Sequence, residues 1–226
     1  MRILVIFRGH NVRYATYERT YVDILKCWLN LKISVIEDLR NNLHTVDTAF
    51  LTYNSDIIDS IKQIIQPTYI ELFPCISQKE NFREVLKFIK INEHTYDRFI
   101  VLRCDMVYKN YITKWPKWDH KGIILIGKDV HWPTKKLYND IVFIIDNSAI
   151  DILLSLGDSI YYGENMHALG RALETNNIDF EIMYDGYYHT TDHPIIGIAS
   201  INEIPIFDKP YVDNAKSLDD ISKWNY

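Results

Sequence analysis

The sequence predicts an α/β protein in which a mostly parallel central sheet is flanked by helices on both faces. Short apolar runs alternate with amphipathic segments through the first half of the chain, as they do in βαβ units. The first run, residues 3–7, is continuously apolar and ends at Arg8 and Gly9, which is typical of a buried strand leading into a turn. No linker or internal repeat divides the 226 residues. We therefore expect a single domain over residues 1–208, followed by a tail at 209–226.

Each further element has its own local signal. Apolar residues at three- and four-residue spacing predict a helix over 14–31, and Asn54 and Ser55 can cap a helix over 56–65. Pro67 ends that helix. Ser77 and Glu80 have the spacing of a capping box for a helix that runs to about residue 91. Strands are expected at 33–36, 48–53, 69–73, 98–108, 123–126, 141–145 and 180–183, and helices at 148–156 and about 164–176.

Composition excludes several classes of protein. Hydrophobic residues make up 47% and charged residues 24% of the chain, as in an ordinary globular protein. The net charge of −5 lacks the basic surplus of a nucleic-acid binder, so we expect no nucleic-acid partner. The three cysteines form no CxxC motif and predict neither a zinc site nor a disulfide framework. No stretch approaches the roughly 20 apolar residues of a membrane span, so we expect a soluble, cytoplasmic protein.

The segment FIVLRCDMVY at 99–108 contains the first candidate site. Side chains alternate along a strand, so Arg103 and Asp105 are expected on one face. Ligands of open α/β sheets collect beyond the carboxyl ends of the strands. A carboxylate there can hold a divalent cation that bridges two phosphates, and an arginine can pair with phosphate oxygens. The alternative is a surface aspartate paired with its neighbouring arginine.

The loop after the first strand is the second candidate. It contains Arg8, Gly9, His10 and Arg13. With only one glycine it is neither a GxGxxG fingerprint nor a P-loop, which removes the usual dinucleotide and NTPase interpretations. Two cations and a histidine at the end of a strand are well placed to meet a nucleotide. The alternative is a polar turn with solvated charges.

A third cluster lies late in the chain. Glu164 and His167 are three residues apart at the start of an expected helix and would share a face. His189 and His193 follow a tyrosine-rich segment. A histidine beside a carboxylate can act as a general base or complete a metal site. HTTDH is not HExxH, so a metalloprotease is not indicated. Each of these histidines can instead be structural.

Aromatic residues also gather in segments expected to be loops: Trp115, Trp118, His131 and Trp132. Such rings can stack on the apolar faces of sugars. The alternative is that they pack these loops onto the sheet.

Three of these segments together resemble the GT-A-type glycosyltransferases of large DNA viruses: MRILVIFRGHN, YDRFIVLRCDMVY and NDIVFIIDNSAIDILLSL. The likeness is greatest to the chlorella-virus domains that decorate the major capsid protein. It is looser to bacterial capsule and lipopolysaccharide transferases with an R-x-D strand. The likeness extends from Met1 to about His193, and its motifs are short. It implies a GT-A-like sheet, a nucleotide-sugar donor (UDP-sugar favoured) and a glycan or glycoprotein acceptor, such as a viral capsid glycan.

The resemblance also implies site residues. Asp105 matches the second aspartate of the family D-x-D pattern, whereas Arg103 replaces the first and cannot ligate a cation. A divalent cation, Mn²⁺ or Mg²⁺, would then be held by Asp105 with His189 or His193. Alternatively, Arg103 neutralises phosphate without a metal. The loop 8–13 matches the position where these enzymes hold the base and ribose.

Candidate catalytic carboxylates follow from the same resemblance. Asp140 and Asp146 lie around a strand near the acceptor side, and Glu164 is a third candidate. An inverting transfer needs a base, for which Asp140, Glu164 or His167 is the candidate. Two other classes stay open. One is a sugar nucleotidyltransferase, although the glycine-rich loop typical of those enzymes is absent. The other is a non-catalytic nucleotide-sugar or carbohydrate binder.

Overall fold

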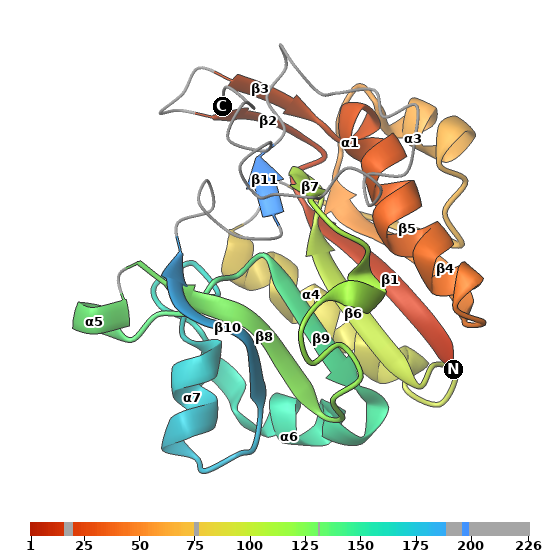
Figure 1. Ribbon diagram of the computed structural model, residues 1–226. Helices are drawn as coiled ribbons and strands as arrows, with labels where there is room; N and C mark the ends of the chain where they lie inside the picture. The colour runs from red at the N-terminus through yellow and green to blue at the C-terminus, as the bar shows by residue number, and fades with distance from the viewer. Residues whose placement is uncertain (16–19, 75–76, 131, 189–195, 199–226) are drawn as a thin grey trace.

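The computed structural model describes residues 1–15, 20–74, 77–130, 132–188 and 196–198. A seven-stranded sheet forms its centre, in the order β10-β8-β9-β6-β1-β4-β5 (Figure 1). Its strands are β1 (Arg2–Gly9), β4 (Thr45–Tyr53), β5 (Tyr69–Phe73), β6 (Arg98–Arg103), β8 (Ile123–Asp129), β9 (Val142–Asp146) and β10 (Glu181–Tyr188). β9 is antiparallel to both of its neighbours, and the other neighbouring strands pair in parallel. The expected mostly parallel sheet is confirmed.

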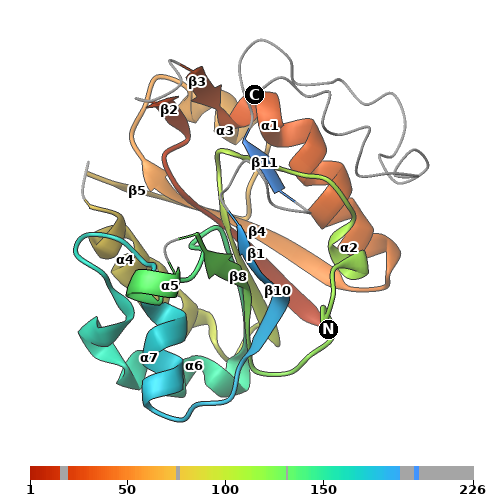
Figure 2. The same ribbon diagram turned by 60° about the vertical axis from the view of Figure 1, so that its left-hand side comes forward.

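Helices cover both faces of this sheet (Figure 2). Alternate residues of β1 divide between two hydrophobic clusters, with Ile3, Val5 and Phe7 in one and Leu4 and Ile6 in the other. The first cluster also contains buried side chains from four helices: α1 (Ile24–Leu31), a π-helix (Lys32–Glu37), α2 (Asp38–Asn41) and α3 (Ile58–Ile64). The second includes α4 (Gln78–Asn92), α6 (Ile150–Ser155) and α7 (Leu169–Thr175). This is the layered arrangement that the alternating pattern predicts.

Short elements surround these layers. β2 (Val12–Ala15) and β3 (Thr20–Asp23) form an antiparallel hairpin, and β7 (Met106–Tyr108) pairs with β11 (Ile196–Ile198). The remaining elements are α5 (Trp132–Lys135) and 3₁₀ turns at Ile112–Lys114, Asn147–Ala149 and Gly157–Ile160. The Asn30 side chain of α1 accepts from the backbone N–H of Tyr108 at 2.7 Å and donates to its carbonyl at 2.9 Å. This amide therefore ties β7 to the helix.

The expected strand at 33–36 is wrong, because this segment continues the helical run as a π-helix. Cys27, Leu31, Val35 and Leu39 follow at four-residue spacing and are all fully inaccessible to solvent. That period keeps one helical stripe in the core and outweighs the β-branched composition of the segment.

Other boundaries differ from expectation as well. The helix expected from residue 14 begins at Ile24, where the Asp23 carboxylate accepts from the Leu25 N–H at 2.8 Å, and a hairpin precedes it. The single strand expected over 98–108 breaks at Cys104 and Asp105, which form a turn between β6 and β7. The helix expected from 164 begins at Leu169.

The capping box at the start of α4 is confirmed. The Ser77 Oγ accepts from the Glu80 N–H at 3.3 Å, and the Glu80 carboxylate accepts from the Ser77 N–H at 3.2 Å.

Cys27 and Cys104 are buried free thiols, whereas Cys75 lies outside the described residues. Over the part of the chain that the structure describes, no helix is both long and apolar enough to cross a membrane.

Gly170 in α7 provides a test of the packing. A Cβ added there would lie 2.5 Å from the ring of the buried Tyr138. Helix propensity alone favours alanine over glycine by about 1 kcal/mol. The overlap instead predicts that Gly170→Ala lowers the free energy of unfolding, by about 1–3 kcal/mol. Urea denaturation measures the sign, and a more stable variant would contradict the packing of α7 against Tyr138.

Candidate active site

A cavity of about 640 Å³ opens beyond the carboxyl ends of the parallel strands. It is lined by Arg8, Gly9, His10, Tyr53, Gln78, Arg103, Asp105, Asp129, Lys135, Leu137, Asn139, Asp140, Tyr162, Asn165 and His167. β4 pairs with one side of β1 and β6 with the other, so the chain connections diverge between β1 and β6. Ligands of open α/β sheets bind at such a switch point. The cavity therefore has the position expected of a ligand site.

The order of the strands in the sheet sets the spatial order of the lining groups along this edge. Tyr53 ends β4, His10 follows β1, and Arg103 ends β6. Asp140 comes next, because β9 runs antiparallel and its first residues lie at the edge where the parallel strands end. Asp129 ends β8, one strand further along. The cavity thus runs from an aromatic group, past a cation, to a group of carboxylates.

Arg8 is a buried cation beneath the cavity. It pairs in register with Arg103 and is only 1% exposed, with its guanidinium 5.5 and 5.7 Å from the ring centroids of Phe82 and Phe143. Its Nη2 donates to the backbone carbonyl of Asp140 and lies 3.4 Å from that residue's Oδ2. Neither Nε nor Nη1 has a hydrogen-bond partner among the described residues. Burial lowers the Arg8 pKa, against the opposing effect of Asp140.

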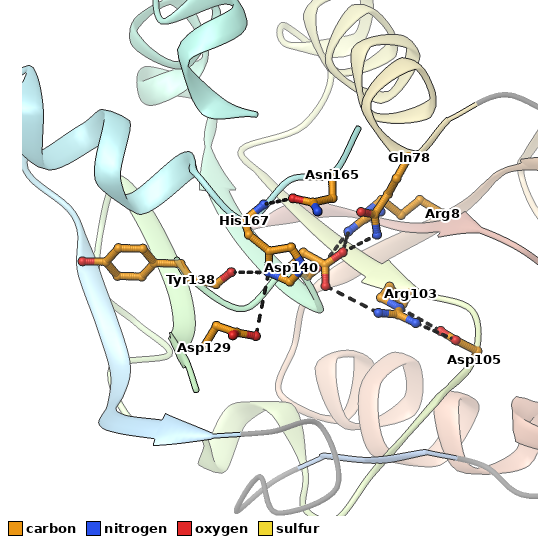
Figure 3. Close-up of polar contacts among 9 residues, drawn as sticks. All are labelled: Arg8, Gln78, Arg103, Asp105, Asp129, Tyr138, Asp140, Asn165 and His167. Atoms are coloured by element: carbon orange, nitrogen blue, oxygen red, sulfur yellow. Dashed lines mark hydrogen bonds and ion pairs between the residues drawn. The ribbon is translucent and has the colours of Figure 1, made fainter. Parts of the chain in front are cut away.

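Asp140 stands at the centre of the polar network (Figure 3). Its carboxylate accepts from Arg8 and from the Gln78 side chain at Oδ2, and from Arg103 at 3.4 Å at Oδ1. Burial acts to raise the Asp140 pKa, but Arg103, His167 and Arg8 outweigh it and hold the pKa well below its usual range. A carboxylate that is so weakly basic is poorly suited to accept a proton near neutral pH.

Arg103 and Asp105 form a two-pronged ion pair. The Arg103 Nε lies 2.9 Å from Oδ1 of Asp105 and its Nη2 lies 2.7 Å from Oδ2. Their side chains are 16% and 7% exposed, and both line the cavity. The pairing that the sequence left open as an alternative is therefore present, but inside the site rather than on an outer surface. The turn that carries Asp105 is held by the Cys104 N–H, which donates to the Arg8 carbonyl at 3.2 Å.

His167 lies at the other side of Asp140 (Figure 3). Its Nδ1 is 2.8 Å from the backbone carbonyl of Tyr138, which can only accept, so Nδ1 carries the proton. When the ring is neutral, its lone pair is therefore on Nε2. Asp129 Oδ2 lies 3.9 Å from Nδ1. His167 is thus a cavity-lining imidazole with a defined tautomer and a basic nitrogen.

The other expected site residues lie in different places. His10 is exposed and stacks on Tyr53, with ring centroids 4.4 Å apart. Glu164 is exposed and does not line the cavity, and its carbonyl accepts from the Lys79 N–H. Asp146 pairs with Arg98 at the opposite edge of the sheet, with Nε and Oδ1 2.5 Å apart. The Arg13 side chain and both His189 and His193 lie outside the described residues.

The three loop tryptophans pack against the hydrophobic clusters, and none of them lines the cavity. Trp115 is 3% exposed in the first cluster, and Trp118 packs against that cluster with the Arg98 guanidinium carbon 5.3 Å from its ring centroid. Trp132 is partly buried against the second cluster, so the interpretation as packing residues is confirmed for all three. Trp132 lies near Tyr187, with ring centroids 5.6 Å apart, while His131 lies outside the described residues.

Several lining residues were missed in the sequence. Asp129 had a usable signal, because it ends a buried strand as Arg103 does, but the strand was expected to stop at residue 126. Gln78 is the first residue of a well-marked helix, yet nothing local indicates that it reaches Asp140. The remaining missed residues lie at the ends of elements or in loops without a distinguishing pattern: Tyr53, Lys135, Leu137, Asn139, Tyr162 and Asn165.

The described donor groups do not suit a divalent cation. Within the described ranges, no group of three His, Cys, Asp or Glu side chains is arranged to hold a metal ion. Both oxygens of Asp105 accept from Arg103, and both oxygens of Asp140 accept from arginine or glutamine. Bringing a cation to these carboxylates would require it to compete with guanidinium groups already in place. The expected Mn²⁺ or Mg²⁺ site stays a prediction, since it also involves His189 and His193.

No family model matches the chain, and no curated protein matches it. Among the solved structures that match is a protein from Desulfovibrio desulfuricans G20 that is named as a nucleotide-diphospho-sugar transferase. It shares 12% sequence identity over 81% of this chain and 80% of its own, with a TM-score of 0.45.

The Arg8–Asp140 pair predicts strong energetic coupling. Arg8→Met leaves a buried carboxylate with fewer partners, and Asp140→Asn leaves a buried guanidinium without its counter-charge. Each should lower the free energy of unfolding by about 3–5 kcal/mol. The double variant should lose less stability than the two single losses added together. Urea denaturation of the wild type, both single variants and the double variant measures this coupling. Additive losses would contradict the pairing.

An ion pair on the surface supplies the control for these stability measurements. Arg83 contacts Asp158 at 2.6 Å, with side chains 42% and 65% exposed. Because water and salt screen such a pair, Arg83→Met should change the stability little.

Proposed function

We propose that this protein is a glycosyltransferase that uses a nucleotide-diphosphate sugar. One observation carries the proposal: the order of groups along a single cavity at the topological switch point. A stacked His10–Tyr53 pair comes first, the Arg103 guanidinium second, and Asp140 with His167 third. A nucleotide sugar presents a base, a diphosphate and a sugar in this same order. The site therefore matches the donor group by group.

The donor would bind across the sheet edge. The base stacks on the exposed His10 ring, which Tyr53 supports from behind. The diphosphate lies beside Arg103, whose planar guanidinium suits paired phosphate oxygens. The sugar then lies near Asp140 and Asn139, which offer hydrogen-bonding groups to its hydroxyls. UDP-sugars are the donors favoured by the resemblance in the sequence, and they are part of this proposal.

We assign the chemical step to Arg103 and His167. The acceptor hydroxyl oxygen bonds to the anomeric carbon as the bond from that carbon to the diphosphate oxygen breaks. Arg103 stabilises the negative charge on the departing nucleoside diphosphate. The hydroxyl proton passes to Nε2 of His167, whose Nδ1–H is fixed by the Tyr138 carbonyl. This assignment corresponds to inversion at the anomeric carbon, with Asp140 as a positioning residue.

The acceptor side is the part of the cavity around Lys135 and Tyr162. The Lys135 ammonium lies 5.5 Å from the centroid of the Tyr162 ring, and Tyr162 is 37% exposed. An exposed aromatic face beside a cation suits a glycan, so we propose a glycan or glycoprotein acceptor. A viral capsid glycan and a cytoplasmic location stay predictions from the sequence.

One observation favours a second function, a non-catalytic nucleotide-sugar binder. Both candidate carboxylates in the described site are neutralised by arginine, so neither resembles an active base or a metal ligand. Hydrolysis of the donor distinguishes the two functions. A transferase slowly passes its sugar to water, whereas a binder does not.

Calorimetric titration with UDP, GDP, CMP and their sugars tests the proposal. We expect one nucleotide series to bind, with release of the free nucleotide from its sugar over time. His167→Gln should lower the transfer rate by about 10²–10⁴ because it removes the proton acceptor. The nucleotide Kd should change little, since His167 lies beyond the phosphates in the proposed order.

The matched control is His94→Gln, because His94 is 94% exposed at the end of α4 and does not line the cavity. It should alter neither the rate nor the Kd. Absence of binding by every nucleotide tested would rule out the glycosyltransferase assignment.

A further inference from the structure

We propose that the donor diphosphate binds the Arg103 guanidinium directly, without a divalent cation. In the ligand-free protein the Asp105 carboxylate occupies this guanidinium, and the phosphate displaces it. Asp105 is then an internal competitor of the substrate rather than a metal ligand. The inference rests on the proposed function for the identity of the ligand. Its chemistry, a carboxylate exchanged for a phosphate, rests on the site alone.

The geometry of the pair supports this exchange. Two nitrogens on one side of the Arg103 guanidinium face the two oxygens of Asp105, at 2.9 and 2.7 Å. Carboxylate and phosphate both present two oxygens at the spacing of this fork, and arginine binds either group with two parallel hydrogen bonds. Both side chains line the cavity, so a phosphate that enters it reaches the guanidinium that Asp105 holds.

The charge of the site points the same way. Arg8, Arg103, Asp105 and Asp140 form a connected set with two positive and two negative side chains. When a diphosphate displaces one of the carboxylates, it takes over that carboxylate's place as an anion beside the two guanidinium groups. A divalent cation bound by Asp105 and Asp140 would instead have to displace the Arg103 guanidinium, which pairs with both carboxylates. The Arg103 guanidinium therefore favours an anion beside it, while the four charges of the set sum to zero.

The position of Asp105 allows the carboxylate to turn away. It lies in the turn between β6 and β7, so its backbone is outside the ladder of the main sheet. The turn is anchored before Asp105 by the Cys104 N–H bonded to the Arg8 carbonyl. It is anchored after Asp105 by Asn30, which holds both backbone groups of Tyr108. Displacement thus requires rotation of the side chain, while the backbone stays in place.

The test is the sign of the effect of Asp105→Asn. The amide keeps the shape of the side chain and removes the competing charge. Titrations use UDP, GDP and inorganic pyrophosphate, each with EDTA and with Mn²⁺. We expect Asp105→Asn to bind the nucleoside diphosphate and pyrophosphate about tenfold more tightly than the wild type, equally in EDTA and Mn²⁺. If Asp105 holds a metal ion, the same substitution weakens binding and the wild type requires Mn²⁺, which overturns the inference.

Two further variants keep the result specific to this pair. Asp158→Asn removes the same charge from a carboxylate that is 65% exposed and outside the cavity lining, so it should leave all affinities unchanged. A tenfold gain there would overturn the inference by showing a general charge effect. Arg103→Lys keeps the charge but removes the two-pronged geometry, and it should weaken binding tenfold or more. Unchanged affinity in Arg103→Lys would also overturn it. Thermal melting without ligand verifies that each variant is folded.

The outcomes separate this inference from the proposed function. Binding of nucleotides only with Mn²⁺ keeps the proposed function and overturns the inference. Binding of pyrophosphate in EDTA, tightened by Asp105→Asn, with no nucleotide bound keeps the inference for a different phosphate ligand and overturns the proposed function. Absence of binding by nucleotides and pyrophosphate alike overturns both.

Discussion

The arrangement of the site depends on one constraint: a guanidinium buried beneath the sheet edge must keep a carboxylate beside it. Arg8 is almost fully inaccessible beside two phenylalanine rings that contact each other, and its charge is tolerable there only because Asp140 lies against it. The same carboxylate reaches Arg103, which in turn holds Asp105. The alternating charges join β1, β6 and the segment before β9. The positions of the polar groups around the cavity follow from this chain of contacts.

The reversed direction of β9 makes this constraint possible. In a fully parallel sheet, the residues before a strand lie at the amino edge, away from the ligand. Because β9 is antiparallel to β6 and β8, the residues before it arrive where its neighbours end. Asp140 thereby reaches the arginines at the ends of β1 and β6. Its other end places Asp146 against Arg98, so the same strand carries a second buried ion pair at the far edge.

Local patterns predicted much of the fold and part of the site. Three features could be recognised from the sequence because each depends on residues that are neighbours along the chain: the buried run before Arg8, the capping box at Ser77 and the R-x-D segment. The π-helix was missed because its β-branched composition suggested a strand, while the stripe that decides its structure begins in the preceding helix. Asp140 was identified, but its contact with Arg8 spans 132 positions and depends on strand direction, which no local pattern encodes.

The amide of Asn30 has a consequence for the rate at which the site can respond. By holding both backbone groups of Tyr108, it fixes the segment after Asp105, much as a neighbouring strand would. The Cys104 N–H fixes the segment before it. Ligand exchange at Arg103 then needs only torsion about side-chain bonds, a faster class of motion than the closure of lids or domains. Occupancy of the site would follow the ligand concentration without waiting for a rearrangement of the fold.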